Sequence, residues 1–470
     1  MTGGVVVVGG GLAGITAALD LADAGRAVTL LETRPRLGGA ASSFSRAFDG
    51  GELTVDNGQH IFLRCCHAYR QLIDRLDAAE LVTTQAKLDI AVLRPDGRRS
   101  RLARTAGLPA PLHLSASLAG YGLLSIADRL RAVRGALAMR RLDPADPSLD
   151  VQTFGRYLAD LGQTTEIINN LWGVLATATL NIDPADASLA LAAKVFRTGL
   201  LDHADAADVG HAVVPLGAIH HDAAWKALVD AGVDVRLSAR VLEVDSPAAS
   251  GPVVQVRERA SDPEGASVAV LRPEAVILAL PHAPMRSVAP ALAAGSLGRT
   301  EALGASPIVN VHVVYDRQVT DLPLAAAVGS PVQWVFDRTS SSGLSDLELS
   351  SGPSHGAQYL AVTVSAADAI IGTPAAELRS TYIDALAQLF PAARSAEVLD
   401  SFVTREPRAT FRQAAGTAEL RPSPKTELEG VYLAGSWTAT GWPDTMESAV
   451  LSGKAAASRI LEGSGTRGRS

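Results

Sequence analysis

Cysteine is almost absent from this chain of 470 residues. The only two cysteines, Cys65 and Cys66, are adjacent, and a disulfide between sequence neighbours would be strained. No third or fourth ligand accompanies them in a pattern that suggests a metal site. We therefore predict buried free thiols in a reducing cytoplasm, and no bound metal.

The chain also lacks long apolar runs and an excess of positive charge. No uninterrupted apolar stretch reaches the roughly 18 residues that a membrane-spanning helix needs. The net charge of −7 argues against general nucleic-acid binding. With 47% hydrophobic and 19% charged residues, the composition is that of a globular protein with room for two or three domains.

The clearest pattern stands at the beginning of the chain. Residues 5–8 are four consecutive valines, which predict a strand buried on both faces. Gly9, Gly11 and Gly14 follow as G-x-G-x-x-G. Gly9 permits the tight turn, Gly11 lets the main chain approach a pyrophosphate, and Gly14 lets the next helix pack closely on the strand.

The residues after these glycines complete a dinucleotide-binding unit. Residues 15–24 predict a helix and residues 27–31 a second strand that ends on Glu32, whose carboxylate can accept hydrogen bonds from ribose hydroxyls. The helix N-terminus would face the phosphates. A glycine-rich turn without a ligand is the alternative, but the strand, helix and acid all stand where dinucleotide binding needs them.

Gly38 and Gly39 extend the pattern to E-x-x-x-x-x-G-G, which resembles the amine oxidase and carotenoid desaturase flavoenzymes. The resemblance implies FAD as the cofactor. Many members carry an arginine after the glycine pair; here Ala40 stands there, so Arg34, Arg36 or the helix dipole must compensate the phosphate charge. This segment assigns the following residues to the cofactor: Gly9, Gly11, Leu12, Ala13, Gly14, Glu32, Arg34, Gly38 and Gly39.

Residues 56–60, Asp-Asn-Gly-Gln-His, resemble a narrower group, the hydroxysqualene dehydroxylases. The resemblance places Gly58 and Gln59 at the flavin. It also makes His60 the candidate catalytic acid, with Asp56 as its orienting partner. The alternative is a turn at residues 57–58 followed by an ordinary semi-buried histidine.

Residues 94–141 differ from the rest of the chain in charge, with ten arginines against two acids. Between residues 126 and 137, apolar and basic residues interleave at helical spacing, so that one helix face can be apolar while its flank is basic. Such a helix is typical of the surface of an anionic bilayer. The alternative is a solvated helix packed on its own domain.

Two later segments resemble the remaining parts of the flavin domain. A helix that ends at residues 231–232, followed by residues 233–281, resembles the family order of helix, glycine, strand, R-V-x-x-V, hairpin and V-I-L-A-x-P, in which the position of Val241 offers main-chain contacts to adenine. Residues 431–453 resemble the closing motif L-A-G-D-x-T … G-x-P-x-x-M-E-G-A, with Ser436 in place of the acid that binds the ribityl chain and Ser448 in place of a glycine. A helix starting near residue 445 would direct its dipole at the flavin. The cofactor residues implied here are Gly435, Ser436, Thr445, Met446, Glu447 and Ala449.

The expected fold is α/β: a Rossmann-like FAD-binding domain of the GR2 type, with an α+β substrate domain built from two insertions. The FAD-binding domain takes residues 1–85, 206–290 and 411–463. The substrate domain takes residues 86–205, which face the membrane, and residues 291–410. Residues 464–470 are expected to be a tail.

The resemblance implies a reaction: reduced FAD replaces the allylic hydroxyl of hydroxysqualene with hydrogen, giving squalene for hopanoid or related triterpene synthesis. A carotenoid desaturase of the phytoene type is the alternative enzyme, and a non-redox prenyl-lipid carrier like the Rab GDP-dissociation inhibitors is the alternative of another class. Only one G-x-G-x-x-G occurs, so the electron donor must be another protein or an unidentified reductant. We expect a cytoplasmic protein without a signal peptide, peripheral on the inner face of the cell membrane.

Overall fold

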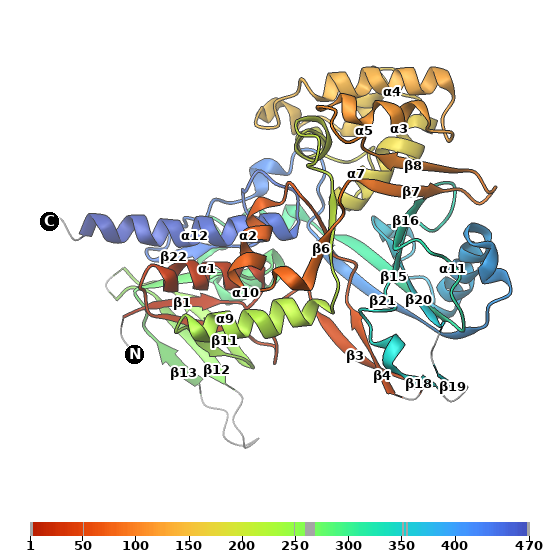
Figure 1. Cartoon of the computed structure of the whole chain (residues 1–470). Coiled ribbons are helices and arrows are strands. Elements are labelled where there is room, and N and C mark those ends of the chain that lie inside the picture. Colours follow the sequence, from red (N-terminus) through yellow and green to blue (C-terminus); the bar gives the residue numbers. More distant parts are fainter. Residues whose placement is uncertain are drawn as a thin grey trace.

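The computed structural model describes residues 3–49, 51–248, 250–258, 268–349, 352–353 and 356–467. Two halves lie side by side, one around a parallel sheet and the other around a larger mixed sheet with a helical cap (Figure 1). Within the described residues, no helix combines the length and the apolar character needed to cross a bilayer.

The first half is organised around five parallel strands in the order β10-β2-β1-β14-β22. These strands are β1 (Val5–Val8), β2 (Val28–Leu31), β10 (Asp234–Arg236), β14 (Ala275–Leu278) and β22 (Val431–Leu433). They come from the beginning, middle and end of the chain and confirm the predicted Rossmann-like fold.

Side chains of a strand point alternately to the two faces of its sheet, which explains why β1 consists of four consecutive valines. Val5 and Val7 pack into the helical layer, whereas Val6 and Val8 pack on the opposite face. That opposite face is covered by an antiparallel sheet, β11 (Ala239–Asp245), β12 (Val253–Glu258) and β13 (Val268–Leu271). Because both faces are buried, every position of the strand is apolar.

The helical layer consists of α1 (Leu12–Asp23), α2 (His67–Arg75), α9 (Ala224–Asp230) and α12 (Met446–Arg467). Helix α1 begins three residues before the predicted start, directly after Gly11. Helix α12 begins one residue after the predicted 445. It continues to Arg467, into the segment expected to be a tail, and residues 468–470 lie outside the described part of the chain.

The second half contains a seven-stranded sheet in the order β21-β15-β20-β17-β16-β7-β8. Its strands are β7 (Asp89–Leu93), β8 (Arg99–Ala103), β15 (Ser306–Tyr315), β16 (Leu324–Ala327), β17 (Trp334–Asp337), β20 (Gln358–Val364) and β21 (Val398–Thr410). Helix α11 (Ala375–Leu389) packs its apolar side on this sheet.

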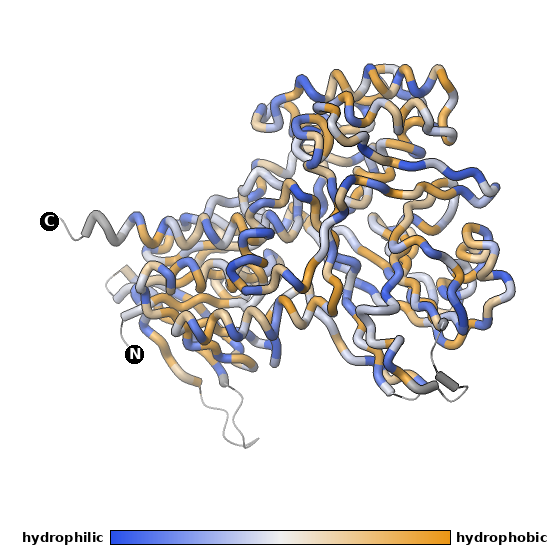
Figure 2. Tube along the Cα trace, in the orientation of Figure 1, coloured by the Kyte–Doolittle hydropathy of each residue, from blue (hydrophilic) through white to orange (hydrophobic). Residues whose placement is uncertain are grey.

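The helical cap lies at the β7–β8 edge of this sheet, at the top of Figure 1. It consists of α3 (Ser115–Ala119), α4 (Ile126–Met139), α5 (Phe154–Asp160), α7 (Gly173–Leu180) and α8 (Leu189–Phe196). Hydrophobic and hydrophilic residues alternate along α4 (Figure 2). That helix buries Ala132, Gly135 and Met139 against the cap.

Smaller elements join the two halves. The strands β5 (Ile61–Leu63), β6 (Val82–Thr84) and β9 (Val209–Ala212) form a three-stranded sheet in which β9 is central. A hairpin of β3 (Ser43–Phe48) and β4 (Gly51–Asp56) precedes β5. Residues 57–60 therefore connect β4 of the hairpin to β5, which belongs to the small sheet that joins the two halves.

Candidate cofactor and lipid site

One continuous cavity of about 1980 Å³ runs from the Rossmann-like sheet into the helical cap. A pocket for a small ligand usually measures roughly 300–1,000 Å³. At one end the walls are the glycine turn after β1 and the residues before α12. At the other end they are apolar side chains of α4, α7 and α8, so the cavity has room for two molecules end to end.

The glycine turn has the three properties predicted from the sequence. Gly9 has φ +108°, and a Cβ there would lie 2.3 Å from the Ala279 carbonyl oxygen. A Cβ at Gly14 would lie 1.8 Å from the Gly9 oxygen, so the helix packs on the turn without room for a side chain. At Gly11 the nearest atom to such a Cβ is the Gly39 Cα at 3.8 Å. The space beside Gly11 therefore belongs to the cavity, as a pyrophosphate site requires.

Glu32 stands at the carboxyl end of β2 and is 7% exposed. Its Oε2 accepts a hydrogen bond from Gly10 N at 2.7 Å, and its Oε1 accepts one from Arg34 N at 2.8 Å. These main-chain donors fix the carboxylate at the cavity wall. The remaining lone pairs of a carboxylate can accept from ribose hydroxyls.

Two arginines lie beside the glycine pair. The guanidinium groups of Arg34 and Arg36 donate to the Gly39 carbonyl, at 3.3 and 3.5 Å, and both residues line the cavity. Burial, followed by the charge of Arg34, lowers the pKa of Arg36. Since Ala40 offers no charge, these arginines are the cations that the structure places nearest the turn.

Asp56 is buried and does not hydrogen-bond to His60 in the described structure. Its Oδ1 accepts from Ser43 Oγ at 2.6 Å and from Leu216 N at 3.0 Å, and its Oδ2 forms an ion pair with Arg338. The expected orienting contact to the histidine is therefore not formed. Asp56 instead joins the hairpin to the second half of the molecule through Arg338.

His60 lines the cavity, as predicted, together with Gly58 and Gln59. Burial, followed by the positive charge of Arg338, lowers the pKa of His60 to about 4. Its imidazole is therefore neutral at pH 7. The buried Gln59 Oε1 has no hydrogen-bond partner among the described residues. Such an orphaned acceptor in a cavity wall fits a bound group that carries an N–H or O–H donor.

The closing segment turns sharply from β22 toward α12. Gly435 has φ +140°, and a Cβ there would lie 2.4 Å from Trp437 Nε1. Ser436, Thr445, Met446 and Ala449 line the cavity. The hydroxyl of Ser448, which replaces the usual glycine, donates to the Ser436 carbonyl at 2.9 Å.

Glu447 also lines the cavity, but both of its carboxylate oxygens are engaged by the protein. They accept hydrogen bonds from Ala68 N at 3.0 Å and Tyr69 N at 2.7 Å, at the beginning of α2. The glutamate thus holds α2 against α12. It shapes the cofactor site, whereas direct contact between its carboxylate and a cofactor is an untested prediction.

Val241 lies on β11 and lines the cavity near Arg240 and Leu242. The ladder between β11 and β12 changes register between Val241 and Glu243. This bulge interrupts the regular pairing beside the cavity. The contact of the Val241 main chain with adenine stays a prediction.

The structure adds residues that no sequence pattern indicated. Lys194 on α8 faces the cavity with its Nζ 4.6 Å from the ring centre of Trp442. No hydrogen bond or ion pair involves its ammonium group among the described residues. Burial lowers the pKa of Lys194. A lysine in an apolar helix gives no signal of this kind in the sequence, because Trp442 is distant along the chain.

His220 is a second residue that sequence patterns did not identify. It is fully buried, its Nδ1 lies 3.0 Å from the Ala41 carbonyl oxygen, and its Nε2 lies 2.9 Å from the Tyr69 hydroxyl. Burial lowers the pKa of His220 to about 4. The neutral ring therefore braces the segment after Gly39 against α2.

The far end of the cavity opens on an exposed apolar surface. Leu112, Val133 and Leu137 both line the cavity and are exposed, by 58%, 42% and 46%. Ile126 and Leu130, which lie on α4 with Val133 and Leu137, are exposed by 74% and 68%. We call these five residues the docking face. The apolar side chains that were expected on one side of this helix thus point away from the protein's own core.

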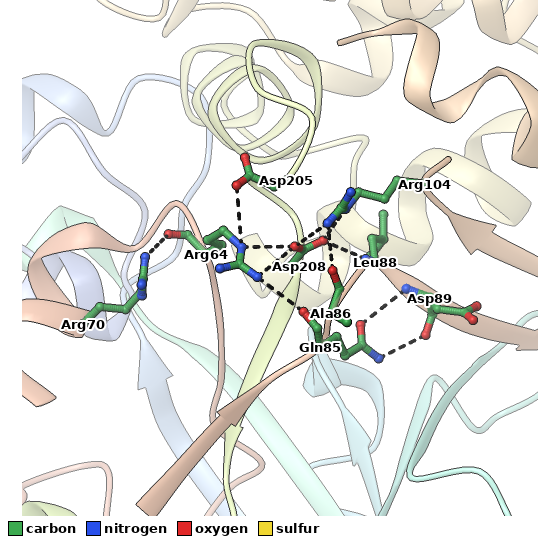
Figure 3. A network of polar contacts seen from close by, with 9 residues as sticks. All are labelled: Arg64, Arg70, Gln85, Ala86, Leu88, Asp89, Arg104, Asp205 and Asp208. Carbon is green, nitrogen blue, oxygen red and sulfur yellow. Dashed lines mark hydrogen bonds and ion pairs between the residues drawn. The ribbon is translucent and has the colours of Figure 1, made fainter. Parts of the chain in front are cut away.

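A buried ion-pair network braces the wall between the two ends (Figure 3). Asp208, which is fully buried just before β9, pairs with Arg104 at 2.6 Å and with Arg64 at 3.0 Å, and it accepts from Leu88 N at 2.7 Å. Burial alone would raise the pKa of Asp208, but these hydrogen bonds and charges lower it. The network ties β5, β7 and β9 together where the two halves join.

Cys65 and Cys66 lie on the same wall as free thiols, the first buried and the second partly exposed. A hydrogen bond with Cys66 lowers the pKa of Cys65. Burial opposes this effect but does not outweigh it. The prediction of free thiols is confirmed, although Cys66 is less buried than expected.

Comparisons with known proteins place this geometry in context. The model of the family described as flavin containing amine oxidoreductase matches residues 12–461. The chain is 30% identical to a hydroxysqualene dehydroxylase of Rhodopseudomonas palustris, over 97% of this chain and 98% of that protein. It is 25% identical to a zeta-carotene desaturase of Zea mays, over 96% of this chain and 82% of that protein. The crystal structure of an oxidoreductase from Methanosarcina mazei superposes with a TM-score of 0.69 at 14% identity, covering 98% of this chain and all of that one.

Proposed function

The chain belongs to the family of flavin-containing amine oxidoreductases, and on this premise we propose that it reduces hydroxysqualene to squalene. It is an FAD-dependent oxidoreductase rather than a non-redox lipid carrier. The residues present fit FAD: an open glycine turn, the carboxylate of Glu32, flanking arginines and an orphaned acceptor on Gln59.

One observation carries the proposal. The cavity continues without interruption from the cofactor turn to apolar walls and then to the exposed docking face. A long, neutral isoprenoid can lie in such a cavity with one reactive carbon at the flavin and its chain among the cap helices. The similarity to hydroxysqualene dehydroxylases along nearly the whole chain supports this substrate over other lipids.

The chemistry requires a proton donor and a dry cavity. The carbon–oxygen bond of the allylic alcohol breaks, the hydroxyl leaves as water with one added proton, and the electron-poor carbon gains a hydride. Reduced FAD supplies that hydride when it is bound. The protein must supply the proton at the hydroxyl oxygen and keep bulk water away from the cation.

His60 is the first candidate for the proton donor, and Lys194 is the second. Both line the cavity. Burial lowers the pKa of His60 to about 4, so its imidazole is neutral at pH 7, and burial also lowers the pKa of Lys194 below its usual value. Arg338 and His220 act electrostatically around His60, and Cys65, Glu447, Arg197 and Asp202 act around Lys194. The pH dependence of the reaction therefore separates the two candidates.

The test is anaerobic single turnover of dithionite-reduced enzyme with hydroxysqualene, following flavin reoxidation and squalene formation. If His60 donates the proton, the rate falls with rising pH above its pKa of about 4, and His60→Ala slows reoxidation by roughly 10²–10⁴. If Lys194 donates it, His60→Ala leaves the rate near that of the parent, and the rate falls with rising pH before the usual lysine pKa of about 10.5 is reached. In that case Lys194→Met, rather than His60→Ala, slows flavin reoxidation.

Lys226→Met, at an exposed lysine paired with Asp230, is the matched control and should turn over like the parent. Oxidised enzyme that desaturates phytoene, while reduced enzyme leaves hydroxysqualene untouched, would replace this proposal with the carotenoid desaturase alternative. Two zeta-carotene desaturases are 26% and 25% identical to this chain along nearly its whole length.

We also propose that the docking face binds an anionic bilayer. Leu112, Val133 and Leu137 rim the cavity opening, so a lipid could pass from the bilayer to the flavin without crossing water. Arg134, Arg140 and Arg141 are exposed beside this face. Apolar area together with basic flanks is typical of reversible binding to negatively charged membranes.

A further inference from the structure

Asp444 occupies a position in the cavity that no sequence pattern assigned. It stands two residues before α12 and lines the cavity. Its Oδ2 accepts a hydrogen bond from Phe411 N at 2.8 Å, and the Ser436 side chain is close enough to lower the pKa of the carboxyl group. Its own N–H donates to Gln413 Oε1 at 2.9 Å. The side chain is thus held firmly, with capacity to accept from a further donor.

The carboxylate lacks a direct cationic partner. Arg421 is near enough to act on it electrostatically, as is His282, but no ion pair to Asp444 occurs among the described residues. The Arg421 guanidinium donates instead to the carbonyls of Ser436 and Trp437, at 2.9 and 3.3 Å. Burial raises the pKa of Asp444, which the hydrogen bonds only partly oppose. A partly buried carboxylate in this state gains stability from hydroxyl donors brought by a ligand.

The neighbouring serines direct this arrangement. Ser448 Oγ bonds to the Ser436 carbonyl and lies 2.6 Å from Thr440 Oγ1. The Ser436 carbonyl is therefore fixed by hydrogen bonds from Ser448 and Arg421, while the Ser436 side chain lies close to the Asp444 carboxylate. An acid at position 436 would reach the same part of the cavity as the carboxylate of Asp444.

The place of Asp444 in the sheet identifies the part of the cofactor that it faces. Glu32 follows β2, and Ser436 follows β22, which is three strands away in the order β2-β1-β14-β22. Three strand spacings are about 14 Å. A dinucleotide laid across the carboxyl ends of these strands, with its pyrophosphate at Gly11, has its adenosine ribose at Glu32 and its second polyol at the other end.

We propose that Asp444, together with Ser436, forms the acceptor pair that binds the ribityl hydroxyls of FAD. Asp444 thereby supplies the carboxylate that the closing motif otherwise carries at position 436. The proposal concerns cofactor binding and holds or fails independently of the reaction with hydroxysqualene.

The test measures the FAD dissociation constant of deflavinated protein, in the absence of any lipid, for four variants. Asp444→Asn and Asp444→Ala should weaken FAD binding by roughly tenfold or more, since a charge-assisted hydrogen bond is lost. Ser436→Asp combined with Asp444→Ala should bind within about threefold of the parent, because the carboxylate returns from the neighbouring position. Asp183→Asn is the control: Asp183 also accepts a main-chain hydrogen bond at 2.8 Å, from Ala185, but it is exposed and outside the cavity.

A second measurement separates binding from structure. For a ligand-binding role, the apoprotein melting temperature stays near that of the parent, and only the rise produced by FAD is reduced. An FAD analogue lacking one ribityl hydroxyl should lose affinity for the parent and little for Asp444→Ala. Unchanged FAD affinity in both single variants would overturn the proposal. So would a lowered apoprotein melting temperature that the Ser436→Asp exchange does not rescue, because Phe411 N would then have been the essential partner.

Discussion

The cofactor end of the cavity is built largely from main chain, whereas the apolar end is built from side chains of distant helices and strands. At the cofactor end, Gly9, Gly11 and Gly14 leave space that side chains would fill, and main-chain N–H groups position Glu32. At the apolar end, Leu112 comes from the turn before α3, whereas Val133 and Leu137 come from α4, and the two elements meet only in the fold. A main-chain site needs particular residues at fixed spacing, while an apolar wall accepts many residues of similar size.

The largest effect is expected from filling the space beside Gly11. Gly11→Val directs a side chain into the cavity, where the nearest protein atom to a Cβ is 3.8 Å away, so the protein should fold but purify without FAD. Flavin absorbance after denaturation measures the content. Gly14→Val is the contrasting variant: its Cβ would lie 1.8 Å from the Gly9 oxygen, so the fold itself should be lost. Full FAD occupancy in Gly11→Val would show that the turn does not hold the cofactor.

The next effect concerns the joint between the two ends. Asp208→Asn leaves Arg64 and Arg104 without their buried carboxylate and should lower the free energy of unfolding by roughly 3–5 kcal/mol. Asp89→Asn, which breaks the more exposed pair with Arg101 in the same region, should cost at most about 1 kcal/mol. Urea unfolding measures both. Equal losses would show that burial of Asp208 does not determine its contribution.

The same ion pair predicts a pH dependence. The pKa of Asp208 is lowered in the folded protein, so its stabilisation is fully present above the unfolded carboxyl pKa, about 3.9, and is lost as the pH falls through the lower folded value. The difference between the parent and Asp208→Asn should therefore be constant at neutral pH and shrink below about pH 4. A difference that is constant down to pH 2 would contradict the assignment.

A smaller effect is expected at the open end. Changing Arg134, Arg140 and Arg141 to Gln should weaken binding to anionic vesicles by about 1 kcal/mol per residue at low salt. The effect should fade as salt shortens the Debye length to about 8 Å. Exchanging Lys226, Arg272 and Arg299, which are exposed elsewhere, should leave vesicle binding near the parent value. If the exchange of Arg134, Arg140 and Arg141 does not change sedimentation with vesicles, these arginines do not contribute to membrane binding.

The smallest effect on stability should come from the docking face itself. Leu130→Ser removes a side chain that is 68% exposed, so the free energy of unfolding should change by no more than about 0.5 kcal/mol. Vesicle binding should nevertheless weaken, and this loss should persist at high salt because it is apolar in origin. A large loss of stability would mean that Leu130 packs in the folded protein.

The sequence by itself determined the cofactor end. The order of valines, glycines and Glu32 predicted a strand, a turn, a helix and an acid, because each step depends on local backbone geometry. The same holds for the turn at Gly435 and the helix that follows it. The apolar and basic alternation of residues 126–137 also predicted an amphipathic helix, although not which way its apolar side would face.

Only the tertiary structure decided which side chains meet. Asp56 pairs with Arg338 rather than with His60, and Lys194 reaches Trp442, because the two insertions fold back onto the flavin half. Glu447 binds α2, and Asp444 joins Ser436 at the cavity wall. Such contacts join residues far apart along the chain, and no local pattern specifies them. The protonation of His60 was decided in the same way, since burial and a distant arginine set its pKa.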